Sequence, residues 1–193
     1  MLSFNQYLSE GSFKGKLYHG SNAVFTEFKQ SKARIPNDFY GGGVAYFTSN
    51  YDVGVTYAKS MAKSKGGKPV VYEVDVRIKN IFDVDDVFTG QDLKDILPKD
   101  TEEFARGAGL LGMNADKFTV IVRLEMGKLK LSGKEVFMGL SKGMNQTAKA
   151  RDHLISKGYN GLRYNGGENM GMATKHDVYL IYKAKDAKIL STI

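Results

Sequence analysis

A histidine, a glycine and a serine follow one another at the end of a predicted strand, in the segment Leu17-Tyr18-His19-Gly20-Ser21. The histidine ring offers a nitrogen that can donate or accept a hydrogen bond, and the serine offers a hydroxyl. The glycine leaves a stretch of backbone that a ligand can approach closely. The segment therefore predicts a strand end that binds a small polar molecule.

Two tyrosines offer aromatic faces that could form one wall of the same site. Tyr46 lies in the segment Gly41-Gly42-Gly43-Val44-Ala45-Tyr46-Phe47-Thr48-Ser49, and Tyr57 follows it eleven residues later. Taken singly, a tyrosine in a strand or at helical spacing is more often a core residue, and a lone histidine is more often structural. The glycines and the tyrosine spacing have no shared structural reason, so the combination favours a site.

Cleavage of the bond between nicotinamide and ribose in NAD needs groups of these kinds. The leaving group is a flat aromatic cation, and the ribose develops oxocarbenium character. The site must supply aromatic faces, backbone amides for the carboxamide, and polar groups for the ribose hydroxyls. Tyr46, Tyr57 and the Gly20 backbone can supply the faces and the amides. His19 and Ser21 can contact the ribose.

Strands near both ends of the chain, with helices between them, must position these residues. The segment 70–78 alternates apolar and polar residues and is the clearest strand. Strands are expected at residues 16–19, 45–48, 70–78, 159–164, 178–182 and 188–192. Helices are expected at residues 52–65, 91–97, 101–111 and 145–157, the first after a capping signal at Ser49 and Asp52. Residues 118–126 fit either a strand or a buried helix. This order predicts an α+β fold.

Length and composition limit the architecture and the chemistry. The 193 residues favour one domain, residues 11–193, preceded by a short segment at residues 1–10. The chain has no cysteine, and its three histidines lack metal-ligand spacing, so no metal is expected. No apolar run is long enough to span a bilayer, so no membrane partner is expected. The formal charge of +7 favours either contact with nucleic acid or acidic proteins, or simple solubility.

Four segments resemble, in order, the motifs of ADP-ribosyltransferases of the His-Tyr-Glu group, which contains the diphtheria-toxin-like and PARP-like enzymes. They are Tyr18-His19-Gly20-Ser21, Gly43-Val44-Ala45-Tyr46-Phe47-Thr48 with Tyr57, Gly158-Tyr159-Asn160-Gly161 and Asp177-Val178-Tyr179-Leu180-Ile181-Tyr182. The chain is most similar to the small domains of phage and mobile-element polyvalent proteins. The resemblance implies a split β-sandwich of two small antiparallel sheets with flanking helices, and NAD as the substrate in the cleft.

The resemblance also implies a role for each matching residue. His19 matches the histidine that contacts the adenosine-side ribose, and Gly20 matches the glycine that holds the nicotinamide amide. Tyr46 and Tyr57 match the two tyrosines of the nicotinamide pocket. Ser21 matches a position that often helps to bind ribose.

Two positions depart from the pattern of the family. Gly54 stands where a serine usually binds the nicotinamide amide, a contact that Thr48 or Ser49 could replace. Val178 stands at the position of the catalytic glutamate. Asp177 comes one residue earlier and would face the other side of a regular strand.

Three interpretations of the missing glutamate follow. A bulge could turn Asp177 into the cleft, Glu168 in the glycine-rich loop could reach it, or no carboxylate acts there. The first two predict a mono-ADP-ribosyltransferase with catalytic residues His19, Tyr46 and either Asp177 or Glu168. The third predicts an inactive NAD-binding relative.

The segment Leu8-Ser9-Glu10 before Gly11 resembles the cleavage site of head-maturation proteases of T4-like phages. This suggests an enzyme that the head protease trims, that is packed in the virion interior with phage DNA, and that is injected into the host cytoplasm. Its acceptor would be a host protein or nucleic acid, chosen by loops at residues 24–40 and 166–175. A frayed N-terminal helix, or a basic DNA-associated internal head protein, are the alternatives.

Overall fold

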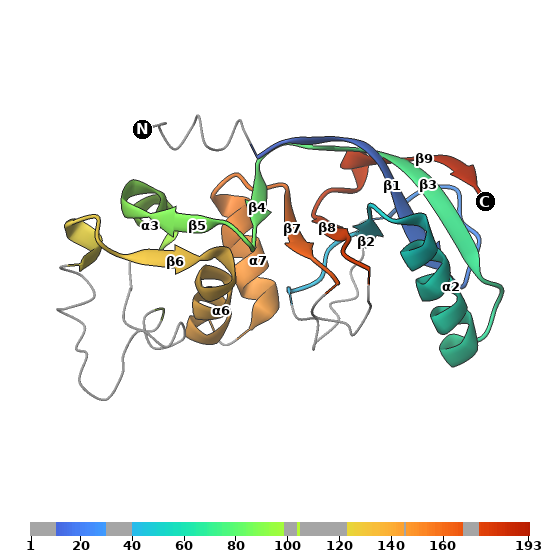
Figure 1. The fold of residues 1–193 in the computed structure, drawn as a ribbon, viewed down its shortest axis with the longest axis horizontal. Coiled ribbons are helices and arrows are strands. Elements are labelled where there is room, and N and C mark those ends of the chain that lie inside the picture. The colour runs from blue at the N-terminus through green and yellow to red at the C-terminus, as the bar shows by residue number, and fades with distance from the viewer. Residues whose placement is uncertain (1–10, 30–39, 99–103, 105–122, 145, 168–173) are drawn as a thin grey trace. The chain divides into compact units, whose positions relative to one another are not determined.

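The computed structural model describes residues 11–29, 40–98, 104, 123–144, 146–167 and 174–193, and Figure 1 shows its elements. The chain divides into two compact units. The sheet unit contains residues 11–32, 43–81 and 160–193, and the helical unit contains residues 1–10, 33–42 and 82–159. Every described residue of the predicted site belongs to the sheet unit.

The sheet unit is built on one long antiparallel pairing, with additional strands on each side. Its strands are β1 (Phe13–Ser21), β2 (Ala45–Thr48), β3 (Val70–Ile78), β7 (Gly161–Asn165), β8 (Asp177–Ile181) and β9 (Ala187–Thr192). A short 3₁₀ turn, η1 (Ala184–Asp186), leads into β9, and β4 (Ile81–Asp83) begins at the last residue before the helical unit. The strand order is β4-β7-β8-β2-β1-β3-β9.

The α+β class predicted from the sequence is confirmed, but the strands are distributed differently from the expected two small sheets. The structure has a seven-stranded sheet and a two-stranded sheet. β1 joins what would otherwise be two halves, because it pairs with β3 along its whole length and with β2 at a single position, Tyr18 opposite Thr48. The seven-stranded sheet is therefore continuous, and β1 is the strand that joins β2 to β3.

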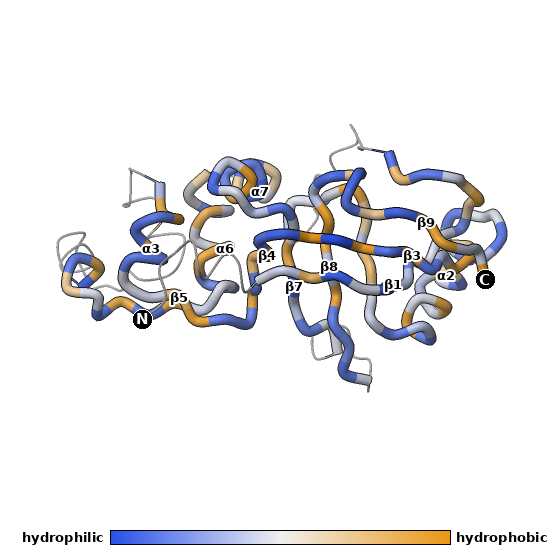
Figure 2. Tube along the Cα trace, turned by 90° about the horizontal axis from the view of Figure 1, so that it is seen from above, coloured by the Kyte–Doolittle hydropathy of each residue, from blue (hydrophilic) through white to orange (hydrophobic). Residues whose placement is uncertain are grey.

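The two faces of this sheet have different roles. On the face that we call the core face, alternate residues of β3 are fully buried, among them Tyr72, Val74 and Val76. Figure 2 shows the corresponding alternation of hydrophobic and hydrophilic residues along β3. The register places Leu17 and His19 of β1 on the same face, opposite Val74 and Tyr72. We call the opposite side, on which helix α2 packs, the helix face.

Helix α2 (Tyr51–Lys65) begins and ends at clear chemical signals. Asn50 is the N-cap, and its side chain accepts hydrogen bonds from the backbone N–H groups of Asp52 and Val53. The predicted capping residue, Ser49, lies one position earlier, and its hydroxyl accepts a hydrogen bond from the backbone N–H of Asp177 instead. The helix stops at Gly66, whose φ of 76° suits glycine.

The described part of the helical unit includes helices α3, α6 and α7 and a two-stranded sheet. Its elements are β5 (Val87–Thr89), α3 (Gly90–Ile96), β6 (Lys130–Ser132), α6 (Gly133–Gly143) and α7 (Thr147–Ser156). Helix α6 was not predicted from the sequence, although Ser132 and Glu135 form a capping box at its start. The predicted helix at residues 101–111 and most of the segment 118–126 lie outside the described residues.

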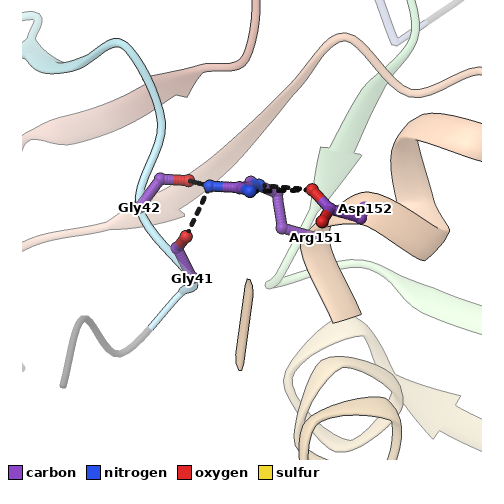
Figure 3. A network of polar contacts seen from close by, with 4 residues as sticks. All are labelled: Gly41, Gly42, Arg151 and Asp152. Atoms are coloured by element: carbon purple, nitrogen blue, oxygen red, sulfur yellow. Dashed lines mark hydrogen bonds and ion pairs between the residues drawn. The ribbon is translucent and has the colours of Figure 1, made fainter. Parts of the chain in front are cut away.

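A bidentate arginine in the helical unit holds the Gly41-Gly42 turn. Nη1 of Arg151 on α7 donates to the backbone oxygens of Gly41, at 2.8 Å, and Gly42, at 3.2 Å. Nη2 of the same guanidinium pairs with the carboxylate of Asp152 at 2.7 Å, as Figure 3 shows. The φ angles of Gly41 and Gly42 are 77° and 65°, and a Cβ on Gly41 would lie 2.3 Å from the oxygen of Thr147. These glycines therefore have a structural reason that the sequence did not reveal.

Replacement of Arg151 by alanine is expected to lower the free energy of unfolding by about 2 kcal/mol, because two buried carbonyl oxygens lose their charged donor. Urea unfolding followed by circular dichroism measures this. Asp152→Ala is the matched control, since it removes only a half-exposed ion pair and should cost less than about 1 kcal/mol. Equal losses in the two variants would show that the guanidinium does not hold the turn.

Candidate functional site

The His19 side chain bridges the neighbouring strands β1 and β2. Its Nδ1 lies 2.8 Å from the backbone oxygen of Tyr46. A carbonyl oxygen only accepts, so Nδ1 carries the proton and donates it. The ring lies among aromatic side chains on the core face, with ring centroids 5.3 Å from Phe28 and 5.6 Å from Phe47. The rings of Phe25 and Tyr72 also contact the His19 ring.

Burial determines the charge of this imidazole. Desolvation lowers the pKa of His19 below its ordinary 6.5, and the hydrogen bond to Tyr46 opposes that shift only in part. The ring is therefore neutral at pH 7. Because Nδ1 holds the one proton, Nε2 has a free lone pair. His19 thus offers a hydrogen-bond acceptor, which suits a ligand hydroxyl.

The lowered pKa of His19 makes stability depend on pH in a predictable direction. Between its folded pKa and 6.5 the unfolded chain binds more protons than the folded protein, so the free energy of unfolding falls as pH drops through this window. The contribution is fully present above about pH 6.5. Urea unfolding of the wild type and His19→Asn at several pH values between about 5 and 7 should therefore show a steeper acid loss in the wild type. Parallel curves would contradict a buried neutral His19.

Gly20 lets helix α2 approach the β1 backbone. A Cβ on Gly20 would lie 2.2 Å from the oxygen of Gly54, 2.7 Å from the nitrogen of Ala58 and 3.0 Å from Cβ of Tyr57. Only glycine allows this approach. The packing brings the first turn after Gly54, including Tyr57, directly against the predicted nicotinamide-binding glycine.

Tyr57 is half-buried on α2, and burial raises the pKa of its phenol, so its hydroxyl stays protonated at neutral pH. Tyr46 is also half-buried, and the register of β2 places it on the helix face, in line with Thr48. Gly20 and the two tyrosines therefore share one face of the sheet unit. His19 points to the core face, and its Nδ1 is joined to the backbone oxygen of Tyr46.

The three predicted hydroxyl residues accept hydrogen bonds from nearby backbone. Ser21 accepts from the N–H of Ala23 at 3.2 Å, and Thr48 from that of Asn50 at 3.1 Å. Ser49 accepts from the N–H of Asp177 at 3.0 Å. Each hydroxyl keeps its proton for donation.

Gly54 replaces the expected serine for a packing reason. A Cβ at this position would lie 3.2 Å from Cβ of Tyr18 and 3.5 Å from Cγ1 of Val71. The absence of a side chain lets α2 lie close to β1 and β3. The departure from the family pattern therefore supports the same close packing that Gly20 allows.

The proposed bulge at Asp177 does not occur. β8 pairs in regular register with β2 and β7, with Thr48 and Tyr164 both opposite Val178. Val178 therefore faces the helix side, and Asp177 faces the core side, as His19 does. The Asp177 carboxylate pairs with Nη2 of Arg163 at 2.7 Å. The alternative candidate, Glu168, lies outside the described residues.

A second histidine lies beside this strand end and was not singled out by sequence reasoning. His176 is 4% exposed, and its Nδ1 donates to the oxygen of Thr174 at 2.9 Å. A Cβ on Gly166 would lie 2.4 Å from its Nε2, so glycine makes room for the ring. His176 comes two residues before Val178, so the alternation of β8 places both on the same face. This spacing of two is the sequence signal that could have pointed to His176.

The described residues show no group of three or more His, Asp or Glu side chains placed to hold a metal ion. Within the same residues, no helix has the length and apolarity needed to cross a membrane.

Comparison with known protein families identifies the family of this chain. The model of a family described as ADP-ribosyltransferase in polyvalent proteins matches residues 9–189. The chain belongs to this family. Comparisons with curated proteins and with solved structures found no match.

Membership in the ADP-ribosyltransferase family implies NAD as the substrate. The matched range extends over both compact units. The described geometry of the sheet unit is compatible with that substrate. Gly20 and Tyr57 lie in contact range of one another, and Tyr46 shares their face. The neutral imidazole of His19, on the core face, is bonded to the backbone oxygen of Tyr46.

Proposed function

We propose that the protein transfers a single ADP-ribose from NAD to a host macromolecule, either a protein or a nucleic acid. Nicotinamide would lie between Tyr46 and Tyr57 against the Gly20 backbone, and Nε2 of His19 would accept a hydrogen bond from the adenosine-side ribose. One observation carries this proposal. The Gly20 backbone meets the turn of α2 that bears Tyr57, directly beside a histidine whose Nδ1 proton is committed to Tyr46.

This arrangement favours the chemistry of nicotinamide release. Two aromatic faces stabilise a flat cation by stacking, and the partly buried setting strengthens each polar contact to the substrate. A neutral His19, in contact with the adenosine-side ribose, adds no positive charge to a site in which the nicotinamide-side ribose becomes cationic in the transition state. The residues therefore hold the substrate without opposing the charge that develops.

Asp177 and Glu168 remain the candidate carboxylates. Asp177 lies on the face of His19 and is held by Arg163, so it could stabilise the ribose cation only from the core side. Glu168, which lies outside the described residues, is the second candidate. An inactive NAD-binding protein is the competing function, and the regular register at Val178 favours it.

Incubation with NAD labelled in its adenine moiety, together with a bacterial lysate, tests the function. Label on a host macromolecule, with equal release of nicotinamide, is the expected result. Asp177→Asn and Glu168→Gln are compared singly, and the variant that lowers release at least about tenfold, a difference of about 1.4 kcal/mol, identifies the acting carboxylate. Release without label would indicate a hydrolase. NAD binding without release would establish the inactive relative.

The proposed delivery by a phage particle and the removal of residues 1–10 stay predictions, because residues 1–10 lie outside the described residues.

A further inference from the structure

Helix α2 and the residues just after it carry a group of exposed lysines. Lys59, Lys63, Lys65 and Lys68 are all exposed on α2 or just after it. Asp52, in the first turn, is the acidic residue of the helix. The segment 51–68 therefore holds four lysines and one carboxylate, more than its share of a formal charge of +7.

Three basic side chains on the strands, by contrast, pair with carboxylates. Lys16 pairs with Glu73 at 2.9 Å, and Arg77 pairs with Asp75 at 3.0 Å. Arg163 pairs with Asp177. In the part of the chain that the structure describes, none of the four lysines of the α2 segment takes part in an ion pair.

Helix stability explains only part of this charge. Lysines in the last turn complement the negative end of the helix dipole, which accounts for Lys63 and Lys65. Lys59 lies one turn earlier, and two lysines at positions i and i+4 repel one another. Among the described residues, no ion pair offsets the repulsion between Lys59 and Lys63. This points to an external anion.

We propose that the outer face of α2 binds the phosphodiester backbone of a nucleic acid through Lys59 and Lys63, with Lys65 and Lys68 at its end. Lys59 and Lys63 lie about 6 Å apart along the helix axis, which spans about two charges of one strand. Ser60 is exposed on the same face, and serine hydroxyls commonly contact phosphate. The hydroxyl of Thr56, also exposed there, donates to the backbone oxygen of Asp52 at 2.9 Å.

The composition of this surface favours phosphate over protein carboxylates. The described α2 helix contains no arginine, the residue that binds carboxylates bidentately and is preferred in protein interfaces. Lysine acts as a point charge and suits a backbone whose position along the surface can vary. The contacts read no bases, so we expect binding that is independent of nucleotide sequence.

This surface is separate from the proposed reaction, because Lys59 and Lys63 point to solvent whereas Gly54 and Ala58 face β1. Binding can therefore be tested without NAD, and its outcome does not depend on transferase activity. Should the transferase also be confirmed, the same helix would carry a nucleic-acid contact outside and Tyr57 inside.

The experiment measures fluorescence anisotropy of the full chain with a fluorescein-labelled DNA of about 20 nucleotides, single-stranded and duplex, at several NaCl concentrations. Lys59→Gln/Lys63→Gln should weaken duplex binding about 30-fold at about 0.15 M salt. The slope of log K against log salt should fall by about 1.8 for duplex and about 1.4 for single strands. Glutamine keeps the helix propensity of lysine, and far-UV circular dichroism checks the helix.

Lys185→Gln/Lys188→Gln is the matched control, because it removes the same charge from exposed positions of the same unit. We expect this variant to keep at least half of the wild-type affinity. Equal weakening by both double variants would show that net charge alone causes the effect, and it would overturn the proposal. Unchanged binding by the α2 variant, or stronger competition by polyglutamate than by unlabelled DNA at equal charge, would overturn it as well.

Discussion

His19→Asn is expected to weaken NAD binding about tenfold, a loss of about 1.4 kcal/mol, while the protein stays folded. Asparagine can place an amide N–H near the position of Nδ1, so the bond to the Tyr46 oxygen can be kept. It has no group at the position of Nε2, so the proposed contact to ribose is lost. Isothermal titration calorimetry with NAD measures the change, and urea unfolding reports the fold.

Two further variants separate the roles of the two ring nitrogens. His19→Ala removes both, so it should lose NAD affinity and also destabilise the sheet by about 1 to 3 kcal/mol, because the Tyr46 oxygen loses its donor. His19→Gln can place its amide near Nε2 and is expected to retain more affinity than His19→Asn. If the asparagine variant bound NAD as tightly as the wild type, His19 would be a structural bridge alone.

Gly20→Ala is expected to lower the free energy of unfolding by about 3 kcal/mol. The new Cβ would meet backbone atoms of α2, at 2.2 Å from the Gly54 oxygen and 2.7 Å from the Ala58 nitrogen. Backbone cannot rotate away as a side chain can, so the helix must shift from β1. Because Tyr57 moves with the helix, NAD binding should be lost together with stability.

Gly15→Ala is the matched control for Gly20→Ala on the same strand. A Cβ there would approach the Phe13 ring at 3.1 Å, and a ring end can move. The control should change the free energy of unfolding by less than about 1 kcal/mol, since alanine also suits a strand better than glycine. A Gly20→Ala protein as stable as the control would mean that α2 packs more loosely than the structure describes. Both variants are compared by urea unfolding.

Local patterns predicted the elements around the site well. The alternation from Val70 to Ile78 matches β3 residue for residue, and Ala45–Thr48 matches β2. These segments carry their own signal, since the period of two fixes which side chains are buried. Helix α2 differed only at its cap, where Asn50 replaces Ser49.

Long-range relations were the part that sequence could not supply. Gly20 was interpreted as a site residue and Gly54 as a departure from the family pattern. In the structure Gly20 lies against the backbone of α2, and Gly54 lies against the side chains of Tyr18 and Val71. The pairing of Arg151 with Gly41 and Gly42 joins residues more than a hundred positions apart. No local pattern encodes such contacts, because each depends on where another segment lies. The face of Asp177 was predicted correctly for a regular strand, and the register has no bulge.

The order of strands in the sheet also governs when it can form. β2 needs β8, with Thr48 opposite Val178, and β3 needs β9, with Tyr72 opposite Thr192. Pairings over such separations close large loops, which slows folding relative to local contacts. On a ribosome at about 5–20 residues per second, the segment from Gly161 to Thr192 takes about 2 to 6 seconds to appear. During that time the continuous segment 82–159 is complete, while two strands beside the candidate site still lack their neighbours.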